Sequence, residues 1–274
     1  MSAKWFHHPD LSLPVVARRA EAELVDALAW YGAFLLTRGR SLWRSPSYPS
    51  RTAYWNAVGR LRKQGVIAYR RKGGAEPVLS VAHLGEADQS ALEPERWWDA
   101  RWAGLWYVLV YDVPEAQRRY RDHLRRLLLQ RRCGYLQNSV WISPRDLRPL
   151  FDDLDQAAAV RNYAHLFESR TVLGHGPDAL VNEAWDFDRL ARIHQRLIED
   201  FQRAIAEVIS HKVPDAGLPA LARQAAYAWR QAVALDPLLP RELHPPGYLG
   251  PEVFALHRAL AVAIRRRVAV LPAP

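Results

Sequence analysis

The stretch LWYVLVYD, residues 105–112, decides how the middle of this chain folds. Apolar side chains follow one another almost without interruption from Leu105 to Tyr111. Runs of this kind are typical of strands that are covered on both faces of a sheet. The sequence therefore predicts a buried strand at these residues, around which the neighbouring segments pack.

The segments that follow have the order of a split β-α-β-β-α-β unit. Pro114 precedes residues 115–132, where Leu124, Leu127 and Leu128 recur at helical spacing and are expected to face inward. The order of strands and helices predicts a ferredoxin-like fold for this region. The later elements are expected at residues 135–138 and 140–143 (strands), 145–159 (helix) and 163–173 (strand).

All of the excess positive charge lies upstream, in residues 1–75. That segment contains 13 Lys and Arg against 4 Asp and Glu, whereas residues 76–274 hold 25 of each. A basic block on a neutral body indicates an anchor for a polyanion. Apolar residues such as Trp30, Trp43 and Trp55 indicate that the block is folded. We expect nucleic acid as the partner; a charged surface without function is the alternative.

The same segment has the element order of a winged helix-turn-helix. A helix is expected at residues 14–36, and Ser50 can cap a second helix at 51–64, which Gly65 ends as a left-handed residue. A hairpin at 66–81 follows. In a winged helix-turn-helix the recognition helix lies in the DNA major groove and the wing contacts the backbone. The alternative is a small structural α+β module.

The helix expected at 51–64 has two different faces, one expected to pack in the core and one expected to contact DNA. Tyr54, Ala57, Val58 and Leu61 form an inner stripe. Arg and Asn side chains on the opposite face can read base edges, and cations on the wing should meet phosphates. The predicted DNA-binding residues are Arg51, Thr52, Asn56, Arg60 and Lys63 on the helix and Arg70, Arg71 and Lys72 on the wing.

The rest of the chain reads as a linker around Gly85 and Pro94 and then as helices from about residue 183 onward. We expect an α+β, multidomain protein. Its predicted domains are a winged helix-turn-helix at 14–84, a ferredoxin-like domain at 97–176 and a helical domain at 180–274. The helices of the last domain are expected at 183–209, 220–234 and 252–268.

Composition narrows the class of protein. The single cysteine, Cys133, rules out a disulfide framework and a thiolate metal cluster, and this usage fits a reducing cytoplasm. No segment is apolar enough for a membrane span, so we expect a cytoplasmic protein that contacts no membrane. No phosphate-binding loop, nucleophile elbow or zinc-protease signature occurs.

Four motifs, taken in order along the chain, resemble the PaaX-type transcriptional repressors. They are WAGLWYVLVYDVPE (102–115), GYLQNSVWISP (134–144), NEAWDFDRL (182–190) and DPLLPRELHPPGYLG (236–250). The resemblance covers almost the whole chain. It implies a regulator of phenylacetate-degradation or related genes that binds double-stranded DNA, forms a dimer through the ferredoxin-like domain and is released by an acyl-CoA effector. We expect no cofactor. One departure is residues 37–50, which contain two prolines and are short of a full positioning helix.

The middle region also resembles the small ferredoxin-like nuclease subunit of the CRISPR spacer-acquisition complex. In that group an Asp at the end of the first strand holds a divalent metal across a dimer interface, and Asp112 is at the matching place. The likeness implies an alternative function, a Mg²⁺-dependent nuclease or DNA-organising subunit with Asp112 as its catalytic and metal-binding residue. A strand-end Asp can equally make a turn bond or cap the helix near Pro114. We expect a regulator without catalytic activity.

Overall fold

The computed structural model describes residues 25–26, 51–70, 78–81, 86–149, 163–170, 174 and 176–269. Contacts within the chain form two compact units. One contains residues 1–94, 192–234 and 249–274, and the other contains residues 95–191 and 235–248. The boundaries of the three expected domains remain a prediction.

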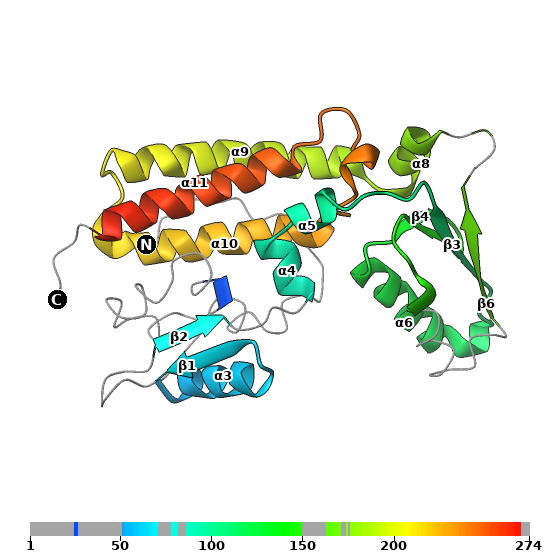
Figure 1. Cartoon of the computed structure of the whole chain (residues 1–274), viewed down its shortest axis with the longest axis horizontal. Helices are drawn as coiled ribbons and strands as arrows, with labels where there is room; N and C mark the ends of the chain where they lie inside the picture. Colours follow the sequence, from blue (N-terminus) through cyan, green and yellow to red (C-terminus); the bar gives the residue numbers. More distant parts are fainter. Residues whose placement is uncertain are drawn as a thin grey trace. The chain divides into compact units, whose positions relative to one another are not determined.

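The amino-terminal lobe contains a helix and a two-stranded hairpin (Figure 1). Helix α3 (Arg51–Lys63) is followed by β1 (Ile67–Arg70) and β2 (Val78–Val81), which pair antiparallel with Ile67 opposite Val81 and Arg70 opposite Val78. The predicted helix and hairpin are therefore confirmed. The helix expected at 14–36 lies outside the described residues, apart from 25 and 26, and so does the segment 37–50.

Gly65 ends α3 in the way the sequence predicts. Its φ is +72°, its N–H donates to the carbonyl of Arg62, and the N–H of Val66 donates to the carbonyl of Leu61 at 2.9 Å. These two bonds form a Schellman motif, which satisfies helix carbonyls that would otherwise lack a donor. A glycine is favoured here because other residues are strained at positive φ.

The segment expected to be a linker contains two short helices instead. They are α4 (Glu86–Leu92) and α5 (Glu95–Trp98), with Pro94 between them. In the first unit, the indole N–H of Trp229 donates to the carbonyl of Ala91 at 2.6 Å. The expected linker is thus ordered by a contact that is distant in sequence, which local composition does not encode.

The second unit is built on a four-stranded antiparallel sheet. Its strands are β3 (Trp106–Tyr111), β4 (Gly134–Gln137), β5 (Val140–Ser143) and β6 (Ala164–Ser169), in the order β4-β5-β3-β6. This order is that of a ferredoxin-like sheet, in which the first strand lies at the centre. The predicted strands are confirmed; most of the helix expected at 145–159 lies outside the described residues.

The two faces of this sheet have separate cores. Helix α6 (Arg118–Gln130) places Leu124 and Leu128 against Tyr107, Leu109 and Tyr111, whose side chains alternate along β3. Cys133 belongs to this core, and burial raises the pKa of its thiol to about 12. It is an apolar filler, as a buried cysteine usually is.

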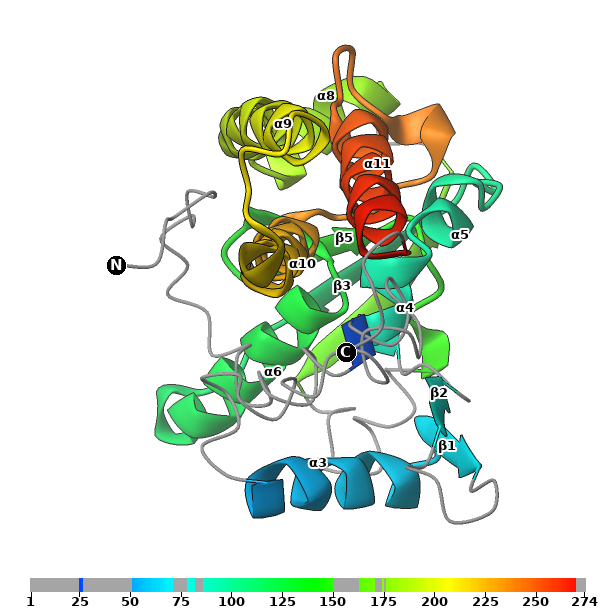
Figure 2. The same cartoon turned by 90° about the vertical axis from the view of Figure 1, so that its left-hand side faces the viewer.

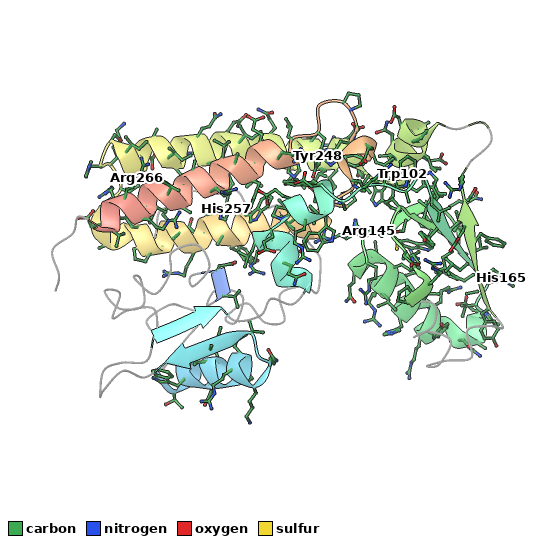
Figure 3. All side chains as sticks on the ribbon, viewed as in Figure 1. Trp102, Arg145, His165, Tyr248, His257 and Arg266 are labelled. Atoms are coloured by element: carbon green, nitrogen blue, oxygen red, sulfur yellow. The ribbon has the colours of Figure 1, made fainter. Side chains whose placement is uncertain are left out.

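Within the residues that the structure describes, the opposite face of the sheet is covered near one end only. Helix α8 (Pro177–Ala184) places Leu180 and Val181 against Trp106 and Ile142, and Leu239 and Leu243 complete this core. Farther along β3 and β6 the same face is more open, and Phe167 is 54% exposed. His165 lies beside it on β6 (Figure 3).

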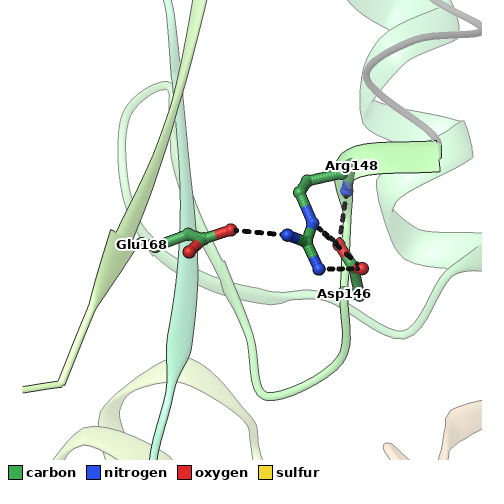
Figure 4. A network of polar contacts seen from close by, with 3 residues as sticks. All are labelled: Asp146, Arg148 and Glu168. Atoms are coloured by element: carbon green, nitrogen blue, oxygen red, sulfur yellow. Dashed lines mark hydrogen bonds and ion pairs between the residues drawn. The ribbon is translucent and has the colours of Figure 1, made fainter.

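A polar network holds the edge strand β6 to the loop after β5 (Figure 4). The guanidinium of Arg148 donates to both carboxylate oxygens of Asp146 and forms an ion pair with Glu168 at 3.5 Å. The hydrogen bonds from Arg148 lower the pKa of Asp146. The three side chains are exposed, so their contribution to stability is small.

Three long helices form most of the carboxyl-terminal part. Helices α9 (Phe187–Ile209), α10 (Leu218–Leu235) and α11 (Gly250–Ala269) lie side by side, and Figure 2 views them nearly end-on. Their shared core includes Phe201, Trp229 and Phe254.

The prediction of one long helix at 183–209 is wrong about where the helix begins. Trp185 is extended, with φ −131° and ψ 141°, and separates α8 from α9. Asp186 then accepts the N–H of Arg189 at 2.9 Å, which is N-cap geometry for a helix that starts at Phe187. No helix within the described residues is long and apolar enough to cross a membrane.

Candidate nucleic-acid interface

The orientation of α3 is fixed by its apolar stripe. Ala57, Val58 and Leu61 recur at helical spacing and are buried, as is Ile67 at the start of the hairpin. A helix that buries one stripe must turn its opposite face outward. The lobe's core therefore decides which side chains of α3 are presented to a partner.

The predicted polar face is exposed. Thr52, Asn56, Arg60 and Lys63 are all exposed along one side of α3. An Arg and an Asn one helical turn apart carry the donors and acceptors that read purine edges in the major groove. The structure confirms that these four residues share an exposed face; their contact with DNA remains a prediction. Arg51 is the first residue of α3 and Arg70 the last of β1.

The basic tip of the hairpin lies outside the described residues, which include neither Arg71 nor Lys72. The pairing of Arg70 with Val78 shows that β1 and β2 are joined by a seven-residue connection from 71 to 77. The phosphate contacts assigned to this tip stay predictions.

Two exposed residues on the flank of this face were not among the predicted contacts. Trp55 is 37% exposed, and Arg62 is exposed in the last turn. The spacing of Trp55, Gly59 and Arg62 at four and three residues could have revealed this second row. Arg60, Arg62 and Lys63 also lie in the last turn of α3, where the negative end of the helix dipole favours cations. Helix stability therefore accounts for part of this positive charge.

Asp112 is the second candidate site. It follows β3, its side chain is exposed, and its N–H donates to the carbonyl of Tyr163 at 2.7 Å. It does not cap the next helix: Pro114 is the N-cap residue of the turn η3 (Glu115–Gln117), and Gln117 is that of α6. The capping role considered for Asp112 is therefore wrong.

A metal site needs more oxygen ligands than this place supplies. In the part of the chain that the structure describes, no three His, Cys, Asp or Glu side chains gather in a way that could hold a metal ion. Asp112 alone offers a divalent cation one carboxylate, whereas hard cations take six or more oxygens. A metal here requires ligands from another subunit, from DNA or from water.

The motif DPLLPRELHPPGYLG forms a loop that is held within the second unit. The Tyr248 hydroxyl donates to Asp236 Oδ2 at 2.5 Å and accepts the indole N–H of Trp98 at 3.1 Å. Arg132 and Arg145 donate to the carbonyls of Asp236 and Pro237. Burial, together with the nearby Asp236 carboxylate, raises the pKa of Tyr248 well above its ordinary value.

This network is structural. Asp236 is buried, and its carboxylate accepts both the Tyr248 hydroxyl and the N–H of Leu238. The contacts fix the loop against α5 and against the segments that flank the strands of the ferredoxin-like sheet. The sequence motif thus marks a packing element, and the motif alone did not indicate which partners it has.

Comparisons with known proteins agree with this architecture. Residues 99–181 match the family model described as the PaaX protein central Cas2-like domain, and residues 185–269 match the PaaX-like protein C-terminal domain. A comparison with curated proteins found no match.

Among solved structures, the uncharacterized protein Rv0674 from Mycobacterium tuberculosis is similar, with a TM-score of 0.55 and 22% sequence identity. The match covers 91% of this chain and 94% of that one. At this identity the likeness concerns the fold alone. The two family models fall in chain order on the ferredoxin-like sheet and on the helices that follow it. The chain is a PaaX-like protein, with a central Cas2-like domain and a PaaX C-terminal domain, and so belongs to a family of transcriptional regulators.

Proposed function

We propose that this protein is a DNA-binding repressor whose amino-terminal lobe acts as a winged helix-turn-helix. The observation that carries the proposal is the exposed row Thr52, Asn56, Arg60 and Lys63 on α3, directly followed by an antiparallel hairpin. In this assignment α3 is the recognition helix and the hairpin is the wing. The lobe at 14–84 binds DNA, the region 97–176 mediates dimerisation and the region 180–274 completes the regulator.

The repressor acts in the cytoplasm as a homodimer formed through the Cas2-like domain. A two-fold-symmetric dimer presents two recognition helices, so it suits a two-fold-related operator. By likeness to the PaaX type, an acyl-CoA thioester releases it from DNA. Sedimentation equilibrium tests the dimer, and release of a bound duplex by a titrated acyl-CoA, but not by free CoA, tests the effector.

Mutations in α3 and the wing test the division of labour. An operator is first selected from a pool of random duplexes, and affinities are then measured for the operator and for an unrelated duplex across a salt series. Replacing Asn56 or Arg60 with Ala should weaken operator binding by about 1–3 kcal/mol per base contact and leave the unrelated duplex nearly unaffected.

Replacing Arg71 and Lys72 with Ala should weaken both duplexes and make the slope of log K against log[salt] shallower by about two. The matched control is Arg192→Ala/Arg196→Ala, which also removes two positive charges, from exposed positions on α9. Equal losses on both duplexes from the α3 and wing variants would contradict the assignment of α3 to base recognition.

The exposure of Asp112 supports a second candidate function, metal-dependent cleavage of DNA. The carboxylate is neither buried nor used as a helix cap, so it is open to a cation shared between two subunits. Duplex DNA incubated with the protein and Mg²⁺ or Mn²⁺ tests this candidate. Cleavage that Asp112→Ala abolishes supports it, and intact DNA under conditions where the protein binds the duplex rules it out.

A further inference from the structure

Helix α6 carries a strongly basic outer face that the charge balance of the whole chain conceals. Residues 118–132 contain seven arginines and one aspartate, a net charge of +6. The remainder of residues 99–181, the Cas2-like domain, carries five basic and nine acidic residues, a net charge of −4. Charge in this domain is therefore segregated onto α6 and the two residues that follow it, which a general requirement for solubility does not explain.

The structure shows which of these arginines face outward. Leu124 and Leu128 are fully buried against the sheet. The side chains exposed on the other side of α6 include Arg118, Arg119, Arg125 and Arg126, and Asp122 is the carboxylate among them. One carboxylate neutralises at most one guanidinium. The Arg126 Nε–H donates a hydrogen bond to the backbone carbonyl of Asp122 at 3.2 Å.

Helix stability does not account for this arrangement. Arg118 and Arg119 occupy the first turn of α6, which contains no acidic residue, and the last turn contains no basic residue. The helix dipole favours the reverse order, with acids at the start and bases at the end. Arginines seven positions apart, such as Arg118 and Arg125, lie two turns and about 10 Å apart, so they form no pair that stabilises the helix. The cations in the last turn of α3, in contrast, agree with its dipole.

We propose that the outer face of α6 is a second DNA-binding surface, which contacts phosphates of duplex DNA without reading its sequence. The proposal rests on the proposed function and extends it from the amino-terminal lobe to the Cas2-like domain. Arginine suits this role because its planar guanidinium forms two parallel bonds to a phosphate. Two pairs of arginines about 10 Å apart along the helix, at 1.5 Å rise per residue, allow α6 to follow a stretch of backbone.

The test compares the full-length protein with Arg118→Gln/Arg119→Gln in titrations of an unrelated duplex over a salt series. Each phosphate contact contributes about 0.9 to the slope of log K against log[salt], so the variant should have a slope shallower by about two. Arg118→Lys/Arg119→Lys should keep the original slope because it keeps the charge. Arg192→Gln/Arg196→Gln on α9 removes the same charge from exposed positions and should leave the slope unchanged.

A readout independent of DNA separates binding from a structural role. Because arginines in the first turn oppose the helix dipole, Arg118→Gln/Arg119→Gln should unfold at the same temperature as the unaltered protein or at a higher one. A lower melting temperature together with weaker binding would assign these residues to folding and overturn the proposal.

The remaining outcomes are also distinct. An unchanged slope in the α6 variant, while α3 and wing variants lose affinity, overturns this inference and leaves the proposed function standing. An equal loss from the α9 variant shows an effect of net charge only and overturns it as well. Unchanged DNA binding with weaker release by an acyl-CoA would assign the arginines to effector phosphates instead. An unaltered protein that binds no duplex overturns both proposals.

Discussion

The guanidinium of Arg230 on α10 donates two hydrogen bonds to the carboxylate of Asp26, from Nε to Oδ2 at 2.6 Å and from Nη2 to Oδ1 at 2.7 Å. The two residues are 204 positions apart in the chain. Asp26 is 4% exposed, so this is a largely buried ion pair with bidentate geometry. It joins the amino-terminal lobe, at the place of its expected first helix, to the carboxyl-terminal helices within one compact unit.

Breaking this pair should be costly. Asp26→Ala removes the carboxylate that balances the charge of the largely buried Arg230 guanidinium. We therefore expect a decrease of about 3–5 kcal/mol in the free energy of unfolding. Urea denaturation followed by tryptophan fluorescence measures it. Asp99→Ala, which breaks the exposed pair with Arg241, is the control and should cost about 1 kcal/mol or less. Equal losses in the two variants would show that the Asp26 pair is solvated.

The same substitution at two glycines of the α3 region should have opposite effects. An added Cβ meets nothing within 4 Å at either Gly59 or Gly65, so only backbone conformation differs. Gly59 lies inside α3, and Gly59→Ala should stabilise by about 0.5–1 kcal/mol. Gly65 has a φ of +72°, and Gly65→Ala should destabilise by about 1–2 kcal/mol. Thermal unfolding of both variants tests this prediction. Stabilisation by both substitutions would contradict the left-handed conformation of Gly65.

Gly134 permits the close approach of β4 and α8. A Cβ at this position would lie 2.6 Å from the Ala184 Cβ and 2.8 Å from the indole ring of Trp185. We expect Gly134→Ala to lower the free energy of unfolding by about 1–3 kcal/mol, because the Ala184 Cβ and the Trp185 indole cannot both move away without loss of packing. The loss should be larger for Gly134→Val. A variant as stable as the unaltered protein would mean that β4 and α8 can separate there at little cost.

Acid should destabilise the carboxyl-terminal helices through His257. Its ring packs against Phe201 and Trp229 with centroids 5.5 and 5.9 Å apart (Figure 3). Burial, with a smaller effect of the Arg230 charge, lowers its pKa to about 3. In the unfolded chain a His has a pKa of about 6.5. Between about pH 6.5 and pH 3 the unfolded chain therefore binds a proton at His257 that the folded protein does not bind. Stability is thus complete above about pH 6.5 and falls as the pH decreases toward 3.

The expected slope from His257 is at most about 1.4 kcal/mol per pH unit. Denaturation curves between pH 4.5 and 7.5 measure it, and His257→Leu should flatten the dependence whatever its effect on absolute stability. Burial also lowers the pKa of His244, so part of the slope should persist in the variant. An identical pH dependence in both proteins would exclude His257 as its source.

Much of the fold follows from local sequence. The apolar run at 105–112, the leucine spacing of α6 and the turn residues predicted every strand that the structure describes, because period and punctuation depend on residues close in the chain. The exposed face of α3 could be predicted for the same reason, since its buried stripe fixes the opposite side. The basic face of α6 was also readable, but averaging charge over 76–274 concealed it.

Local pattern did not reveal α4 and α5, nor the break between α8 and α9, because short helices carry weak periodicity and depend on tertiary contacts. The cap made by Asp186 was the missed local signal.

By itself, then, the sequence determined the order of elements, the ferredoxin-like arrangement of the middle region and the polar face of α3. Only the tertiary structure decided that Asp26 meets Arg230, that Tyr248 bonds Asp236 and Trp98, and that the second face of the sheet packs on Leu239 and Leu243. The physical reason is the separation along the chain of the residues that interact. Helical and strand periods arise from neighbours a few residues apart, whereas these partners are brought together by burial of apolar surface, which has no direction along the chain.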